Sequence, residues 1–267
     1  LDLLSDSSLA ELCAPIVFGD AEVLLRCAEQ TGKSSDFTQM SRDGLESATE
    51  PCVVDLELMD PNQLQPGVIS PASGQATFGY VIEAIDACLA QSVHAVVTCP
   101  ANKEALQSAG VPHPGHTEIF AERTQTEKFC MAFLSDKINC SLVTVHAGYE
   151  QVPGLLNERR IAEVIELTRK THKKLLGKEP RIAVCGLNPH AGENGMFGNR
   201  EEERIIQPAI DAMRAEGCDI AGPLPPDTAF TEAQRRQTDA YVCMYHDQGL
   251  IPVKAIAFES AVNVTLG

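Results

Sequence analysis

The chain has 267 residues, of which 44% are hydrophobic, and its formal net charge at pH 7 is −16. This length and apolar content are enough for a large buried core, in one domain or two lobes. The negative charge argues against nucleic acid or an anionic membrane as a partner, since both call for a basic surface. An anionic substrate would therefore need a local basic pocket.

The ten cysteines run from Cys13 to Cys243 without CxxC spacing, and several fall inside predicted strands and helices. We therefore expect reduced, buried thiols instead of a disulfide framework. No apolar run approaches the roughly 20 residues that a membrane span requires. The N-terminal LDLLSDSSLAEL does not read as a cleavable signal, so the cytoplasm is the expected location.

Strand and helix patterns alternate along the first half of the chain. The segment PIVF at 15–18 predicts a short strand, and the residues after its turn predict a helix over 21–30. From 76 to 90, apolar residues recur every three or four positions, the period of a helix with one buried face. Residues 93–98 predict a strand, and PANKEAL predicts a helix directly after it with Pro100 near its start.

In the second half, helices predicted over 158–176 and 201–216 separate short apolar runs. This alternation predicts an α/β fold with a parallel sheet. The sequence contains no GxGxxG after a strand and no GxxxxGK[ST]. Neither a standard Rossmann phosphate loop nor a P-loop is therefore indicated.

Three histidines each follow an apolar run: His146 after SLVTV, His190 after RIAVCGLNP and His246 after AYVCMY. Parallel sheets bind ligands outside the carboxyl ends of their strands, so we expect these imidazoles to face one cleft. Three neutral imidazoles with an open fourth position suit a catalytic divalent metal. Any one of them alone could be an ordinary loop histidine, but the repeated placement favours a metal site.

Five segments in this order, PANKEAL, PGHTE, LNPHAGENGMFG, GPLPPDT and MYHDQGLIPVK, closely resemble the 4-hydroxythreonine-4-phosphate dehydrogenases of pyridoxal phosphate biosynthesis. The resemblance covers nearly the whole chain. It implies a two-lobed α/β/α fold like that of isocitrate and isopropylmalate dehydrogenases, with the active site in the cleft and no Rossmann loop. We accordingly expect a first lobe from residues 1–110 and 247–267, and a second lobe from residues 111–246.

The resemblance also implies a reaction. An NAD- or NADP-dependent oxidation of 4-phosphooxy-L-threonine would be followed by decarboxylation to 3-amino-2-oxopropyl phosphate. One divalent cation, such as Zn, Mg, Co or Mn, would be held by His146, His190 and His246 and shared across a homodimer interface. Such a cation would favour the substrate alkoxide and then polarise the new ketone.

Four residues match the family's substrate contacts, namely His116, Thr117, Lys254 and Asn263. Thr117 could also cap a helix over Glu118. Lys254, which we place close to an apolar strand, could simply extend into solvent. Asp247 is the candidate for accepting a proton or orienting a metal ligand, and its alternative is an Asx-turn residue.

Other polar residues are weaker candidates. Asn102 and Lys103 stand between a strand end and a helix start, where an anion could bind, although Lys103 could equally be a surface charge. Around His190, the residues that could support a ligand are Asn188, Glu193 and Asn194.

The sequence departs from the family at both ends. It lacks the glycine-rich first strand and the later segment with an arginine and a His-Gly-Thr motif, so we expect an incomplete chain. Three other functions stay open: a sister dehydrogenase of threonate or erythronate 4-phosphate, a metal-dependent hydrolase or aldolase, and a non-catalytic sensor of phosphorylated ligands.

Overall fold

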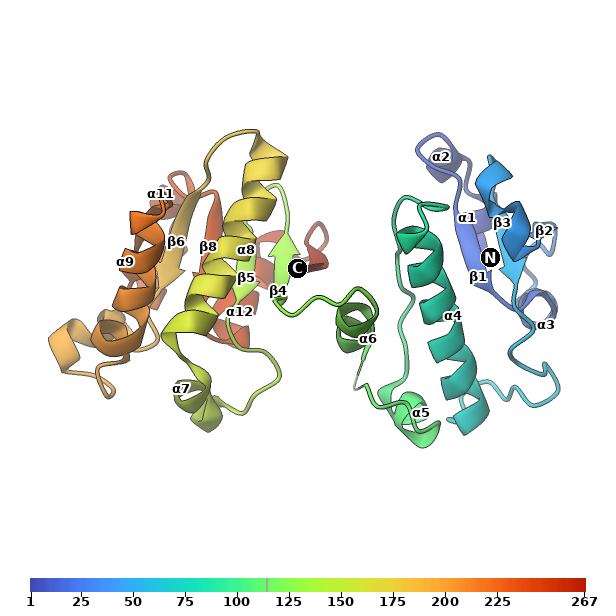
Figure 1. The fold of residues 1–267 in the computed structure, drawn as a ribbon, viewed down its shortest axis with the longest axis horizontal. Helices are drawn as coiled ribbons and strands as arrows, with labels where there is room; N and C mark the ends of the chain where they lie inside the picture. The colour runs from blue at the N-terminus through green and yellow to red at the C-terminus, as the bar shows by residue number, and fades with distance from the viewer. Residues whose placement is uncertain (114) are drawn as a thin grey trace. The chain divides into compact units, whose positions relative to one another are not determined.

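The computed structural model describes residues 1–113 and 115–267, and its contacts divide the chain into two compact units (Figure 1). The first unit is Leu1–Thr126 and the second is Glu127–Gly267. Both units combine helices with parallel strands, which confirms the predicted α/β class. In the described residues, no helix is both long and apolar enough to cross a membrane.

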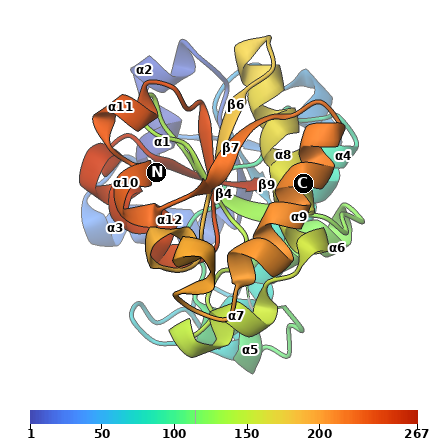
Figure 2. The same ribbon diagram turned by 90° about the vertical axis from the view of Figure 1, so that its left-hand side faces the viewer.

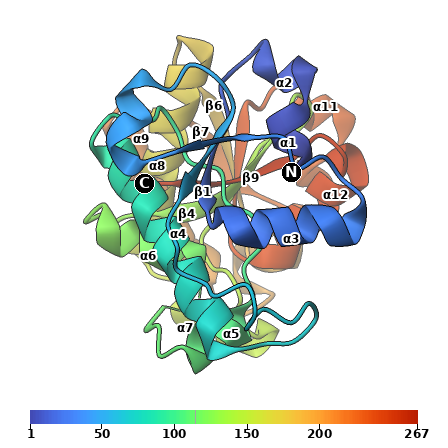
Figure 3. The same cartoon turned by 90° about the vertical axis from the view of Figure 1, so that its right-hand side faces the viewer.

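The first unit is built on three parallel strands in the order β1-β3-β2, all labelled in Figure 1, and Figure 3 shows β1 from another side. The strands are β1 (Ile16–Gly19), β2 (Thr38–Met40) and β3 (Cys52–Asp55). The helices are α1 (Asp2–Ser5), α2 (Ser7–Ala10), α3 (Ala21–Thr31), η1 (Arg42–Ser47), α4 (Pro71–Leu89), α5 (Lys103–Ser108) and α6 (His116–Arg123). The helices α3 and α4 match the ones predicted over 21–30 and 76–90. The second begins earlier than predicted because Ser70 caps it with a hydrogen bond from the Ser73 N–H.

The strand predicted over residues 93–98 is not formed. Val97 is 93% exposed, and no strand is assigned in this segment. A β-strand needs a neighbour to satisfy its backbone, and in the described residues of this unit the segment pairs with none of the three strands of the sheet. The helix predicted in PANKEAL does form, but it starts at Lys103, so Pro100 lies before it.

The second unit contains a six-stranded sheet in the order β7-β6-β8-β5-β4-β9 (Figure 2). Its strands are β4 (Cys130–Leu134), β5 (Cys140–Leu142), β6 (Arg181–Cys185), β7 (Asp219–Leu224), β8 (Ala240–Cys243) and β9 (Val262–Leu266). The first four strands in this order run parallel, and β4 and β9 add antiparallel pairs. The parallel arrangement was predicted from the sequence. It matters for function because the carboxyl ends of the parallel strands all lie at one edge of the sheet.

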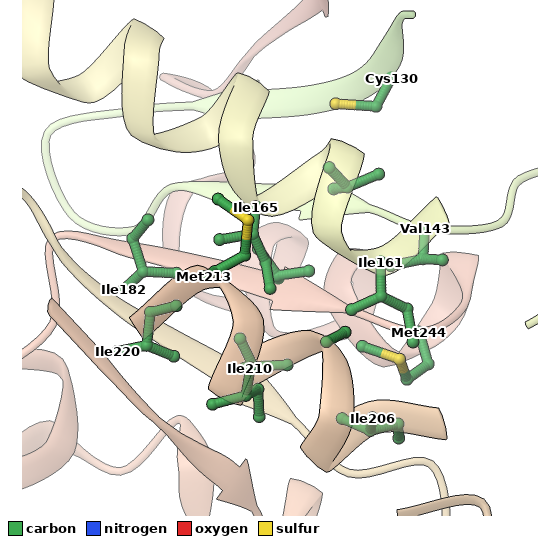
Figure 4. Close-up of a cluster of buried hydrophobic side chains, with 14 of the residues drawn as sticks. Cys130, Val143, Ile161, Ile165, Ile182, Ile206, Ile210, Met213, Ile220 and Met244 are labelled. Carbon is green, nitrogen blue, oxygen red and sulfur yellow. The ribbon is translucent and has the colours of Figure 1, made fainter. Parts of the chain in front are cut away.

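Helices cover both faces of this sheet. They are η2 (Tyr149–Gln151), α7 (Val152–Leu155), α8 (Glu158–Leu176), η3 (Pro189–Gly195), η4 (Glu202–Ile206), α9 (Gln207–Ala215), α10 (Pro226–Ala229), α11 (Glu232–Arg235) and α12 (His246–Ala257). Figure 4 shows the larger core, in which Ile161 and Ile165 of α8 and Ile210 of α9 pack on the sheet. A second core holds Leu250 and Val253 of α12.

The compact units have different bounds from the predicted lobes. Residues 247–267 were expected in the first lobe, but they belong to the second unit. Leu250 and Val253 are buried in its core, and β9 pairs with β4 along its whole length. All ten cysteines lie in the described residues and are free. Six are buried as expected, whereas Cys13 and Cys99 are exposed and Cys27 and Cys88 are partly exposed.

A buried histidine in α8 makes the stability of the second unit depend on pH. His172 is 2% exposed, and burial lowers its pKa from the ordinary 6.5. Its Nδ1 lies 2.9 Å from the Thr168 carbonyl, while its Nε2 has no hydrogen-bond partner among the described residues. The folded state therefore favours the neutral ring, and the unfolded chain takes up a proton first as the pH falls.

We expect the free energy of unfolding to fall as the pH drops below 6.5, by at most about 1.4 kcal/mol per pH unit from this group. Urea unfolding of the wild type and of His172→Leu, at pH 7.5, 6.5 and 5.5, measures this contribution. The variant should lose less stability over this range than the wild type. Identical pH dependence in the two proteins would show that His172 does not contribute.

Candidate active site

The three predicted metal histidines follow three neighbouring strands. In the sheet, β8 lies between β6 and β5, and all three run parallel, so their carboxyl ends meet at one edge. His146 follows β5, His190 follows β6 and His246 follows β8. The placement of these residues after strands is as predicted.

Two of the three imidazoles lie beside each other. The Thr144 hydroxyl donates to the Met244 carbonyl at 2.8 Å, which ties the segment after β5 to the segment after β8. Two residues beyond each of these positions stand His146 and His246, and their ring centroids are 6.2 Å apart with a 38° tilt. The parallel register of β5 and β8 therefore brings this pair together.

The third histidine is held in an uncommon backbone conformation. Residues 190–194 have φ values of 53°, 52°, 79°, 43° and 56°, so the chain makes a left-handed turn. His146 also has a positive φ, 50°. Each non-glycine residue in this region costs roughly 1–2 kcal/mol, so surrounding contacts must hold the turn. Such outliers cluster at functional sites, which favours a role for this edge.

A buried carboxylate, that of Glu202, binds the residues that lead into this turn. Glu202 is 3% exposed, and its Oε1 accepts the backbone N–H groups of Leu187 at 2.9 Å and Asn188 at 2.8 Å. Its Oε2 accepts the Asn188 side-chain amide at 3.0 Å. A Cβ on Gly192 would lie 2.6 Å from the same Oε2, so only glycine allows this close approach.

Glu201 supports the same segment. It is 4% exposed, and its Oε2 accepts the Asn188 amide at 2.9 Å and the Asn199 N–H at 2.8 Å. Burial alone would raise its pKa, but the hydrogen bonds from Asn188 and Asn199 outweigh it, and the pKa of Glu201 is lowered. Neither glutamate is indicated by the sequence, because an acidic run at a predicted helix start resembles a solvated surface.

The described residues of one chain do not bring all three predicted metal ligands together. The His190 side chain is 62% exposed, with Nδ1 3.6 Å from Glu193 Oε2 and the ring beside Phe197. Within residues 1–113 and 115–267, no three histidine, cysteine, aspartate or glutamate side chains are close enough to hold a metal ion. The donor type suits zinc and similar cations, and one chain contributes an adjacent pair of imidazoles.

Asp247 contacts the central histidine. Its Oδ1 lies 2.7 Å from His246 Nδ1, and the two residues open α12 after the N-cap residue Tyr245. A carboxylate at Nδ1 fixes the tautomer and leaves Nε2 as the ring's free nitrogen, as found for many metal-binding histidines. The contact fits the orienting role of Asp247. No Asx-turn hydrogen bond to this side chain occurs in the described part of the chain.

The substrate candidates are spread over both units. His116 and Thr117 begin α6 in the first unit, and burial lowers the pKa of His116. Because the N-cap of α6 is Gly115, Thr117 is not the cap that the sequence suggested. Lys254 lies in the last turn of α12 and not beside a strand, and it is exposed. Asn263 is exposed on the edge strand β9, opposite Phe133.

Asn102 has a structural role in the first unit. Its side chain accepts the Ala105 N–H at 2.9 Å and caps α5, with Lys103 as the first helical residue. This capping accounts for an asparagine at that position. A helix this short gives no further support to the anion site considered for Asn102 and Lys103.

The sequence and the fold can now be compared with known proteins. The family described as pyridoxal phosphate biosynthetic protein PdxA matches residues 11–267. A putative D-threonate 4-phosphate dehydrogenase from Oceanobacillus iheyensis is 43% identical, covering 99% of this chain and 80% of the relative. A 4-hydroxythreonine-4-phosphate dehydrogenase from Desulfosudis oleivorans is 42% identical over 100% of this chain and 80% of its own.

Solved structures agree with these relatives. The crystal structure of a 4-hydroxythreonine-4-phosphate dehydrogenase from Klebsiella pneumoniae has a TM-score of 0.88 and 39% identity, over 99% of this chain and 80% of that one. A terephthalate 1,2-cis-dihydrodiol dehydrogenase from Burkholderia xenovorans has a TM-score of 0.65 and 29% identity, over 94% and 77%. The chain thus has the mixed α/β fold of these solved dehydrogenases. The chain belongs to the pyridoxal phosphate biosynthetic protein PdxA family.

Proposed function

We propose that this chain oxidises the secondary alcohol of 4-phosphooxy-L-threonine with NAD or NADP, and that the product loses carbon dioxide to give 3-amino-2-oxopropyl phosphate. Membership of the family and relatives named for this activity support the proposal. The observation that carries it is the sheet edge with His146, His190 and His246, two of which have left-handed backbone conformations. We further propose that the fold is of the isocitrate dehydrogenase type.

A divalent cation is part of this proposal. His146, His190 and His246 would hold it, and it would supply Lewis-acid polarisation of the oxygen that is oxidised. Since one chain gathers only the His146–His246 pair, a homodimer that contributes a histidine from each subunit is the arrangement we propose. Asp247 would keep Nε2 of His246 available by holding Nδ1.

The chain's own polar residues would bind and orient the substrate. Lys254 supplies a cation for the phosphate or carboxylate, which a protein with a net charge of −16 must provide locally. His116, whose pKa is lowered by burial, would act as a neutral hydrogen-bonding group. Thr117 and Asn263 would add uncharged contacts.

The second candidate substrate is D-threonate 4-phosphate. Relatives with 43% and 42% identity are named for different activities, so overall similarity favours neither acid. Both are phosphorylated hydroxy acids and would use the same cation and metal contacts. The decisive difference lies at the substituent beside the carboxylate.

The test is absorbance at the reduced-nicotinamide band. Each phosphorylated acid is supplied with NAD or NADP, before and after chelation and with added Zn²⁺, Mg²⁺, Co²⁺ or Mn²⁺. Reduction with 4-phosphooxy-L-threonine above that with D-threonate 4-phosphate supports the main proposal, and the reverse order supports the second candidate. Phosphate or carbonyl products without nucleotide reduction would indicate a hydrolase or aldolase, and binding without turnover a sensor.

Replacing Lys254 by methionine should weaken use of the phosphorylated acid. The apolar stem is largely kept, and the lost charge-assisted contact is expected to cost about 2 kcal/mol, or about 30-fold in kcat/KM. Nucleotide affinity should change much less. Steady-state kinetics with both ligands varied measures the two effects.

Lys174→Met is the matched control, because Lys174 is also an exposed lysine in the last turn of a helix. It should leave kcat/KM unchanged. If Lys254→Met behaved like this control, Lys254 would be an ordinary solvent-exposed cation near a helix C-terminus. A selective loss of nucleotide binding would assign it to the cofactor.

A further inference from the structure

A buried glutamine links two of the histidine-bearing segments. Gln248 lies two residues after His246 in α12 and is 6% exposed. Its Oε1 accepts the Met244 N–H at 2.7 Å, and its Nε2 donates to the Gly186 carbonyl at 2.7 Å. One side chain therefore satisfies a buried donor after the end of β8 and a buried acceptor after the end of β6.

The two backbone groups that it joins lead directly to the candidate ligands. Met244 follows β8 and stands two residues before His246. Gly186 follows β6 and opens the segment that reaches His190, and its own N–H donates to the Leu224 carbonyl at 2.8 Å. Gln248 is thus a direct polar connection between the His246 and His190 segments.

The connection continues at both ends. On one side, the Met244 carbonyl accepts the Thr144 hydroxyl at 2.8 Å, two residues before His146. On the other side, the residues after Gly186 donate their N–H groups to Glu202, which holds the left-handed turn. Buried hydrogen bonds therefore run from one histidine segment to the next across the carboxyl edge of the sheet.

We propose that Gln248 is a positioning residue that fixes the His190 segment relative to His246. Only a primary amide offers a donor and an acceptor in this geometry, so neither a carboxylate nor an apolar side chain of equal length can replace both contacts. The consequence for metal affinity rests on the proposed function. Groups that orient metal ligands typically change affinity by 10–100-fold when they are removed, which sets the size of the expected effect at about that range.

The experiment compares Gln248→Met with Thr168→Val. Methionine keeps the length of the side chain and removes both hydrogen bonds. Thr168 is fully buried in the same unit, and its hydroxyl lies 2.8 Å from the Ser141 hydroxyl and 2.7 Å from the Val164 carbonyl. The control therefore also loses buried hydrogen bonds, but none to the segments after β6 and β8. Gln248→Glu, which keeps an acceptor for the Met244 N–H, serves if the methionine variant does not fold.

Two measurements are made on the full chain. Hydrogen–deuterium exchange of residues 186–197 in the metal-free protein should be faster in the Gln248 variants and unchanged in Thr168→Val. The Zn²⁺ dissociation constant, from competition with a chelator, should rise by about 10–100-fold in the Gln248 variants only. Wild-type exchange together with wild-type Zn²⁺ affinity in Gln248→Met would overturn the proposal.

The two proposals fail in different ways. A wild-type protein that bound no Zn²⁺ or other divalent cation would overturn the metal part of the proposed function. The exchange comparison in the metal-free protein would then decide the role of Gln248 by itself. Faster exchange of 186–197 in both Gln248→Met and Thr168→Val would count against it, because the effect would be general loss of stability.

Discussion

Replacing His190 by asparagine is expected to remove most bound divalent metal and to lower kcat/KM by more than about 100-fold, or about 3 kcal/mol. Asparagine is chosen because His190 has a φ of 53°, and asparagine tolerates this left-handed conformation. The side chain is 62% exposed, so little core packing is lost and the fold should persist. The variant therefore tests the loss of the imidazole without a change of the backbone or the core.

Metal content per chain by atomic emission and steady-state kinetics measure the effect, and circular dichroism checks the fold. His94→Asn is the control, since His94 is also exposed but lies outside the sheet edge. It should bind metal and turn over like the wild type. Undiminished metal content in His190→Asn would remove His190 from the ligand set, whatever happened to the rate.

Replacing Glu202 by alanine is expected to lower the free energy of unfolding of the second unit by about 3 kcal/mol or more. The buried N–H groups of Leu187 and Asn188 lose their acceptor, and each unsatisfied group costs roughly 1–3 kcal/mol. The segment that leads into the strained turn at 190–194 also loses this anchor. Turnover should therefore decline even at temperatures where the unit is folded.

Glu203→Ala is the matched control, because Glu203 is the next residue and its side chain is 38% exposed with only a 3.9 Å contact to Arg200. An exposed pair of this kind contributes at most about 1 kcal/mol. Chemical denaturation of the second unit compares the free energy of unfolding of the two variants. Equal losses of stability in both would contradict the role assigned to the buried carboxylate.

Local signals explain which elements were predictable. The helix over 158–176 matches α8 to the residue, because Asn157 caps its start and Gly177 ends it with a left-handed φ of 68°. Both signals come from the residues that directly flank the helix. No flanking residue gives a comparable signal for the strand predicted over 93–98, because a strand depends on a partner strand that the local sequence does not specify.

By itself, the sequence determined the α/β class, the family and the placement of His146, His190 and His246 after parallel strands. These conclusions rest on periodicity and on motifs, which are properties of neighbouring residues. Only the tertiary structure decided that His146 and His246 are neighbours, that residues 190–194 form a left-handed turn, and that residues 247–267 belong to the second unit. The roles of Glu202 and Gln248 also follow only from the tertiary structure. Asn188 is 14 positions from Glu202 and Gly186 is 62 positions from Gln248, and only folding brings these groups within hydrogen-bond distance.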